Sequence, residues 1–178
     1  MDRSQNYERV FKKKLSPIKL IFVYLGYVLL SAAAVLLILW TLNPYISVLA
    51  VTAAVLIIVL THKYTRVELE YEFMGGIFTV SHIYGKSRRR VICEVELSDC
   101  VSIDFATEEK SARALHPTPE KVYDARSSAD AKDVIVAVWE EAKNERYVIF
   151  FEYDERTLVS LFKANAQACS LEIRTKAR

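Results

Sequence analysis

Residues 18–42 read IKLIFVYLGYVLLSAAAVLLILWTL and residues 45–61 read YISVLAVTAAVLIIVLT, with Asn43-Pro44 between them. Lys19 is the single Asp, Glu, Lys or Arg in the two stretches. At about 1.5 Å of rise per residue, the first stretch exceeds a hydrocarbon core of ~30 Å, and the second is close to the minimum length. Asn-Pro favours a turn, and so short a connection makes the two helices antiparallel neighbours. The sequence therefore predicts a two-helix transmembrane hairpin at residues 18–61.

Basic residues flank this hairpin on one side of the membrane only, since the connecting turn has no charge. The flanking residues are Lys12, Lys13, Lys14, Lys19, Lys63 and Arg66. Because positive charge is retained in the cytoplasm, we expect a multi-pass protein of the cell membrane with both termini cytoplasmic. The apolar run continues past the small residues 31–34 and a second span follows, which disfavours a cleaved signal peptide. Residues 1–17 are polar and basic, and we expect them to be disordered or to form a brief helix on the membrane surface.

Charge and cysteine content limit the classes of function. The formal net charge is +2, and the basic excess lies in the first 65 residues, so residues 66–178 are mildly acidic. Nucleic acid is therefore an unexpected partner. Cys93, Cys100 and Cys169 lack CxxC spacing, and we interpret them as reduced thiols.

Residues 66–178 are predicted to form a β-rich soluble domain. In residues 67–73, apolar residues alternate with Glu68, Glu70 and Glu72, and Gly75-Gly76 then supplies a hairpin turn. Further alternation predicts strands at residues 77–84, 91–97, 101–105, 134–139 and 147–153. Residues 106–132 lose periodicity, which predicts a long loop with one short strand near Val122-Tyr123. Asp154 is a suitable cap for an amphipathic helix at residues 155–168, and we expect the remaining residues to fray.

This order of elements resembles the pleckstrin-homology-like (PH-like) domain. The segments that carry the resemblance are VELEYEFMGGIFTV at 67–80 and YVIFFEYDERTLVSLF at 147–162. It implies an α+β, mostly β fold, in which an antiparallel barrel or sandwich is capped by a C-terminal helix. The whole chain resembles uncharacterised bacterial two-pass membrane proteins with such a domain at the C-terminal end. The resemblance also implies a binding or assembly role on the cytoplasmic membrane surface. The phosphoinositide loop between the first two strands would be Met74-Gly75-Gly76, which has no basic residue.

The candidate binding site in the soluble domain is a basic cluster of Lys86, Arg88, Arg89 and Arg90. Guanidinium groups pair with phosphates and carboxylates, so the cluster suits anionic lipid headgroups or an acidic partner. Alternatively, strand alternation places Arg88 and Arg90 near Glu94 and Glu96, where cross-strand pairs would neutralise them.

No motif in the sequence predicts catalysis, a metal or a cofactor. His62, His82 and His116 lack metal-ligand spacing, and phosphate-binding glycine loops and nucleophile elbows are absent. We therefore favour a protein-interaction or assembly module, with a protein partner or a second copy of the chain, over an enzyme. The alternative is a sensor of anionic lipids or their headgroups.

Overall fold

The protein folds into two compact units in the computed structural model, which describes residues 7–14, 17–62, 65–85, 88–141 and 145–177. One unit comprises Lys14–Val67, and the other joins Met1–Lys13 to Glu68–Arg178. The second unit therefore contains chain from both sides of the first.

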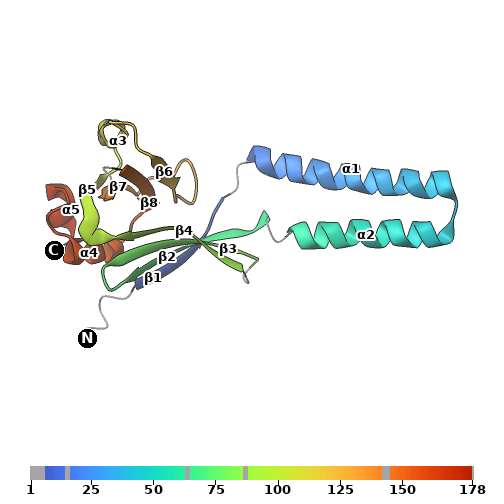
Figure 1. Ribbon diagram of the computed structural model, residues 1–178, viewed down its shortest axis with the longest axis horizontal. Helices are drawn as coiled ribbons and strands as arrows, with labels where there is room; N and C mark the ends of the chain where they lie inside the picture. Colours follow the sequence, from blue (N-terminus) through green and yellow to red (C-terminus); the bar gives the residue numbers. More distant parts are fainter. Residues whose placement is uncertain (1–6, 15–16, 63–64, 86–87, 142–144, 178) are drawn as a thin grey trace. The chain divides into compact units, whose positions relative to one another are not determined.

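The first unit is a pair of apolar helices, α1 (Pro17–Thr41) and α2 (Pro44–His62) (Figure 1). Each begins with a proline, whose fixed φ suits the first helical turn. Asn43 Oδ1 accepts a hydrogen bond from the Tyr45 amide at 3.0 Å, which starts α2. The hydroxyls of Tyr27 and Thr61 lie 3.0 Å apart and join the two helices. Both helices are long and apolar enough to cross a membrane, and they lie where the sequence predicts them.

The second unit begins with an antiparallel four-stranded sheet in the order β1-β2-β3-β4. Its strands are β1 (Tyr7–Lys12), β2 (Val67–Met74), β3 (Ile77–Tyr84) and β4 (Arg88–Glu96). Gly75 and Gly76 make the predicted β2–β3 turn with φ of 60° and 89°, in the left-handed region that favours glycine. The register between β3 and β4 shifts between Val80 and Ser81, which is a β-bulge.

Strand β1 corrects our expectation for the N-terminal segment. Its residues pair with β2 from Tyr7 opposite Phe73 to Lys12 opposite Glu68. The Tyr7 ring stacks on Phe73 at 6.1 Å, and Phe11 meets the Tyr71 ring edge-on at 4.8 Å. A disordered or membrane-surface leader is therefore wrong for residues 7–12, because they form a strand whose Tyr7 and Phe11 side chains pack against the domain core. The strand is difficult to recognise because its partner begins only after the apolar helices.

Because β1 is the first strand of the sheet, the loop between the first two strands of the PH-like fold is a different segment from the one predicted. Met74-Gly75-Gly76 joins β2 to β3 and is not the loop between the first two strands. The chain between β1 and β2 is instead the whole pair of apolar helices, flanked by basic residues.

A second four-stranded sheet has the order β5-β7-β8-β6. It contains β5 (Cys100–Phe105), β6 (Lys121–Asp124), β7 (Val134–Glu141) and β8 (Glu145–Glu152), with a 3₁₀ turn at Leu97–Asp99 before β5. The predicted short strand is β6, which pairs parallel to β8. The predicted loop also contains a helix, α3 (Glu108–Ala114), whose N-cap Thr107 accepts from the Lys110 amide at 3.3 Å. Seven residues give too few turns for a visible helical period.

The C-terminal region contains two helices, α4 (Glu155–Ala164) and α5 (Leu171–Lys176). Asp154 caps α4 as predicted, by accepting from the Thr157 amide at 2.8 Å. The helix ends before residue 168 because the Asn165 side chain donates to the carbonyls of Leu97 and Cys100, which turns the chain toward β5.

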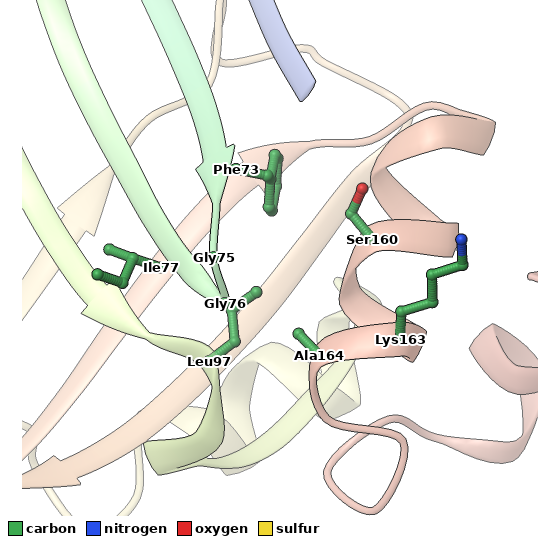
Figure 2. Close-up of a pocket in the computed structure, with 8 residues that line it drawn as sticks. All are labelled: Phe73, Gly75, Gly76, Ile77, Leu97, Ser160, Lys163 and Ala164. Carbon is green, nitrogen blue, oxygen red and sulfur yellow. The ribbon is translucent and has the colours of Figure 1, made fainter. Parts of the chain in front are cut away.

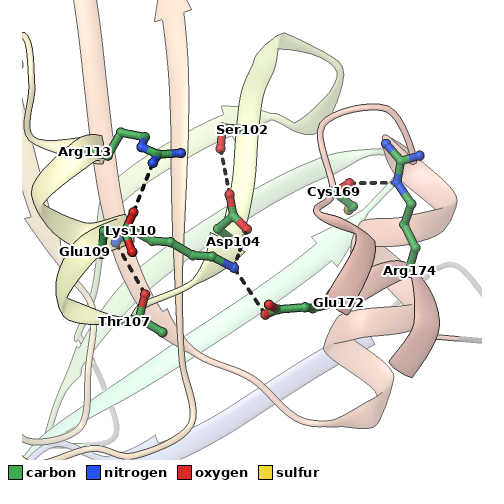
Figure 3. A network of polar contacts seen from close by, with 9 residues as sticks. All are labelled: Ser102, Asp104, Thr107, Glu109, Lys110, Arg113, Cys169, Glu172 and Arg174. Carbon is green, nitrogen blue, oxygen red and sulfur yellow. Dashed lines mark hydrogen bonds and ion pairs between the residues drawn. The ribbon is translucent and has the colours of Figure 1, made fainter.

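The expected fraying after residue 168 is wrong. The Ile173 side chain is fully buried, and Lys110 Nζ lies 3.2 Å from carboxylate oxygens of both Asp104 and Glu172 (Figure 3). This bridge ties α5 to α3 and β5.

One main core lies between the two sheets, α4 and α5, with Tyr71, Phe78 and Phe151 among its largest side chains. A smaller apolar cluster on the other face of the second sheet packs Ala114 of α3 against Val136, Val138 and Val148. Cys93, Cys100 and Cys169 are buried free thiols, as the sequence predicts.

Candidate functional site: a basic end of the first sheet

The topology of the first sheet gathers basic residues from distant parts of the sequence at one end. Lys12 at the end of β1 pairs with Glu68 at the start of β2, and Tyr84 at the end of β3 pairs with Arg88 at the start of β4. Because adjacent strands are antiparallel, these four strand ends share one edge of the domain. Both connections to the apolar helices leave from the same edge. We call Lys12, Lys13, His82, Arg88 and Arg90 the basic end.

His82 lies at the centre of the basic end. Its Nε2 is 3.4 Å from Lys13 Nζ, its Nδ1 is 3.3 Å from the Tyr84 hydroxyl, and Arg90 is its cross-strand partner. Burial and, to a smaller extent, the charges of Lys13 and Arg90 together lower the pKa of His82 to about 4. The imidazole is therefore neutral at pH 7, and Lys13, Arg88 and Arg90 provide the positive charge around it.

Arg88 and Arg90 do not pair with the acids that strand alternation predicts. Glu94 lies opposite Thr79 and Glu96 opposite Ile77, toward the other end of β4. Arg88 and Arg90 are exposed and form no ion pair within the described part of the chain. The β-bulge reverses which face of β4 each residue occupies, so the predicted neutralisation is wrong.

Arg89 is separated from its two neighbours and takes a structural role. Its Nε lies 2.6 Å from Glu70 Oε2 and its Nη2 lies 2.5 Å from Glu72 Oε2, both on β2. Cross-strand pairing places it on the opposite face from His82, next to Ser81, whose hydroxyl accepts from Arg89 Nε at 3.2 Å. Arg89 is thus not part of the basic end.

The remaining basic residues predicted for the site lie in or beside the connections. Lys14 and Arg66 are exposed, and Lys19 lies in α1. Lys63 and Lys86 fall outside the residues that the structure describes. The sequence predicts Lys13 only as a residue of the membrane flank and assigns His82 no role in binding, because only the strand register brings the two beside Arg90.

A cavity of about 180 Å³ lies at the other end of the first sheet, between the β2–β3 turn and α4. Phe73, Leu97 and Ala164 form its apolar lining, and Ser160 points toward Phe73, whereas Ile77 and Lys163 point away (Figure 2). Met74 and Ile77 beside it are 52% and 39% exposed. The cavity depends on the contact of α4 with a distant turn, so no local sequence pattern marks it.

No group of three His, Cys, Asp or Glu side chains suited to a metal occurs among the residues placed by the structure. The three thiols lie away from solvent, and burial raises the pKa of Cys93 and Cys100 to about 12 and that of Cys169 to about 11. They are therefore poor nucleophiles at neutral pH.

The two sheets and the capping helix define this protein as a PH-like domain that carries a pair of apolar helices between its first two strands. The chain belongs to the family described as bacterial PH-like domain (DUF6106), whose model matches residues 5–170. The match includes β1 and both apolar helices. No curated protein and no solved structure matches the chain.

Proposed function

We propose that this protein is a membrane-anchored interaction module, held against the inner leaflet of the cell membrane by its basic end. In this proposal α1 and α2 cross the membrane as a hairpin, and both termini are cytoplasmic. The observation that supports it is the convergence of Lys12, Lys13, Arg88 and Arg90 on the edge from which both connections leave. The proposed role is binding and not catalysis.

The electrostatics of the basic end suit anionic headgroups. A Lys or Arg near an anionic leaflet contributes about 1 kcal/mol, and this attraction falls off within about one Debye length. Arg88 and Arg90 are exposed without ion-pair partners among the described residues, so contact with a headgroup breaks no ion pair within the protein.

The test must separate headgroup contact from anchoring, because the apolar helices retain the protein in any bilayer. The full-length protein is placed in nanodiscs of zwitterionic or partly anionic lipid, and hydrogen exchange is measured across β3 and β4. Slower exchange in anionic lipid is expected, and Arg88→Glu with Arg90→Glu should remove the difference.

A control variant with Arg113→Glu and Lys163→Glu makes the same change of charge away from the basic end and should behave as the wild type. Equal exchange in both lipids for the wild-type protein would refute headgroup contact. High salt should weaken the difference, because the proposed contact is electrostatic.

A second candidate function is recognition of a protein partner at the cavity between the β2–β3 turn and α4. The observation that favours it is the pair of exposed apolar residues, Met74 and Ile77, beside an apolar-lined cavity. A photo-crosslinking amino acid at position 74 should capture a defined protein in cells, and one at the similarly exposed Val122 should not. Ala164→Trp, which fills the cavity, should abolish that adduct. Equal adducts at both positions would argue against a specific site.

A further inference from the structure

A pocket lies on the outer face of the second sheet, in the region where the sequence loses periodicity. It has a volume of about 270 Å³. Its walls come from α3, the β5–α3 connection and the β6–β7 connection, and its floor is Phe150 and Val134. Long connections that enclose a cavity on a rigid sheet are frequent binding sites.

Three polar side chains line this pocket: Ser111, Arg126 and Lys132. Lys132 forms no ion pair, and the Ser111 hydroxyl forms no hydrogen bond, within the described part of the protein. The Arg126 side chain is only 30% exposed, and its guanidinium lies 5.8 Å from the centre of the Phe150 ring. Two cationic side chains, of which Lys132 is exposed, and a hydroxyl therefore line a pocket that has an apolar floor.

Two nearby carboxylates, those of Asp124 and Glu152, already have partners. Asp124 accepts two hydrogen bonds of 2.8 Å from Nε and Nη2 of Arg126, which fixes the guanidinium and leaves its Nη1 available. Glu152 Oε1 accepts from the Ser127 amide at 2.6 Å. These contacts order the connection after β6, and the Lys132 ammonium has no counter-ion among the residues that the structure places.

We propose that this pocket binds a small organic oxyanion, a carboxylate or a phosphate monoester, that carries an apolar or planar group. The oxyanion would accept hydrogen bonds from Lys132, Ser111 and Arg126, and the apolar group would lie on Phe150. The volume is slightly below that of drug-sized sites, which limits the ligand to about one ring with its anionic group. This site is independent of the basic end and of membrane anchoring.

The probes are benzoate and phenyl phosphate, which share a ring and differ in the oxyanion, together with benzyl alcohol as the neutral analogue. Each is titrated into the full-length, isotope-labelled protein in detergent micelles, and amide signals near Ser111, Lys132 and Phe150 are followed by NMR. We expect saturable shifts with at least one anion and none with benzyl alcohol. Saturation by benzoate alone assigns a carboxylate, by phenyl phosphate alone a phosphate, and by both any such oxyanion.

Lys132→Gln and Ser111→Ala should each weaken binding, the former by about tenfold, as expected for loss of a charged hydrogen bond. Arg113→Gln removes the same charge from an exposed position on α3 outside the pocket and should leave the affinity unchanged. Unshifted signals elsewhere confirm that each variant is folded. The proposal is overturned if neither anion produces saturable shifts, or if Lys132→Gln binds as tightly as Arg113→Gln.

Discussion

Arg89 stabilises the first sheet, whereas its neighbour Arg90 is exposed and has no ion-pair partner among the residues that the structure describes. Arg89→Gln removes an ion pair from Glu70, which is only 5% exposed, and from Glu72. We expect the free energy of unfolding to fall by about 1–2 kcal/mol, which is less than for a fully buried pair because the Arg89 side chain is 47% exposed. Arg90→Gln should change it by less than about 0.5 kcal/mol. Chemical denaturation of the two variants checks this, and equal losses would contradict the assigned roles.

Glu70 should make stability depend on pH. Burial raises the pKa of Glu70, and the charge of Arg89 opposes this shift. A hydrogen bond with Glu8 and the charges of Glu8 and Glu72 raise the pKa further. A raised pKa means that the folded state holds the proton more tightly, so this stability is present below the ordinary glutamate pKa and is lost as pH rises through the raised value. The melting temperature of the Glu70→Gln variant should therefore fall less steeply with rising pH than that of the wild-type protein. Glu94→Gln, on the exposed part of β4, should keep the wild-type slope, and identical slopes for all three proteins would exclude Glu70 as the cause.

The behaviour of the arginines shows where residue-level reasoning from sequence ends. Alternation correctly places Arg89 on the opposite face from Arg88 and Arg90, but it pairs the latter two with the wrong acids. The cause is the β-bulge opposite Val80 and Ser81, which has no glycine to signal it. The basic composition of the site was visible in the sequence, and its geometry was not.

At the scale of elements, β1 should be required for the soluble domain to fold. A chain that begins at Arg66 leaves the β2 edge unpaired and exposes the aromatic surface that Tyr7 and Phe11 cover. A chain in which residues 7–13 are joined by a short flexible linker to residues 67–178 restores both. We expect the first to aggregate, or to lose about 2 kcal/mol or more, and the second to give dispersed NMR signals. Equal stability of the two chains would show that β1 is dispensable.

The bridge from Lys110 to Asp104 and Glu172 should control the order of α5 (Figure 3). Lys110→Met removes both contacts at a cost of about 0.5–1 kcal/mol, because the groups are partly exposed. Amide exchange in residues 168–176 should accelerate, while exchange in β7 stays constant. Arg113→Met removes an exposed pair within α3 alone and serves as the control. Faster amide exchange throughout the domain would mean that Lys110 stabilises the whole fold and not α5 in particular.

The elements that the sequence predicts correctly are those with enough residues to show a period. Both apolar helices, the β2–β3 hairpin and the start of α4 belong to this group. The elements it missed, β1, α3 and α5, are short and depend on distant partners. β1 requires β2 across the intervening helices, and α5 requires Ile173 in the core and Lys110 of α3. Local propensity contains no information about such contacts.

At the scale of the whole molecule, the informative feature is the place of the apolar helices in the chain, which is between β1 and β2 of the PH-like domain. β1 and β2 are hydrogen-bonded neighbours, although the chain between them is the entire helical pair. The family match covers this arrangement from residue 5 to residue 170, so the helices are part of the family pattern and not an addition to one end. The two connections to the helices therefore start from strands that are paired with each other. The residues of the basic end lie at the same edge of the sheet.

The proposed topology places the α1–α2 turn outside the cell, and a cysteine there should report it. Asn43→Cys in intact cells should react with a membrane-impermeant maleimide, because the turn would be extracytoplasmic. The native background should be low, since all three native thiols are buried and burial raises the pKa of each to about 11 or 12. Glu96→Cys, on the exposed end of β4, should react only after the membrane is permeabilised. Labelling of Glu96→Cys but not of Asn43→Cys in intact cells would invert the topology, and it would place the basic end against the outer leaflet instead of the inner one.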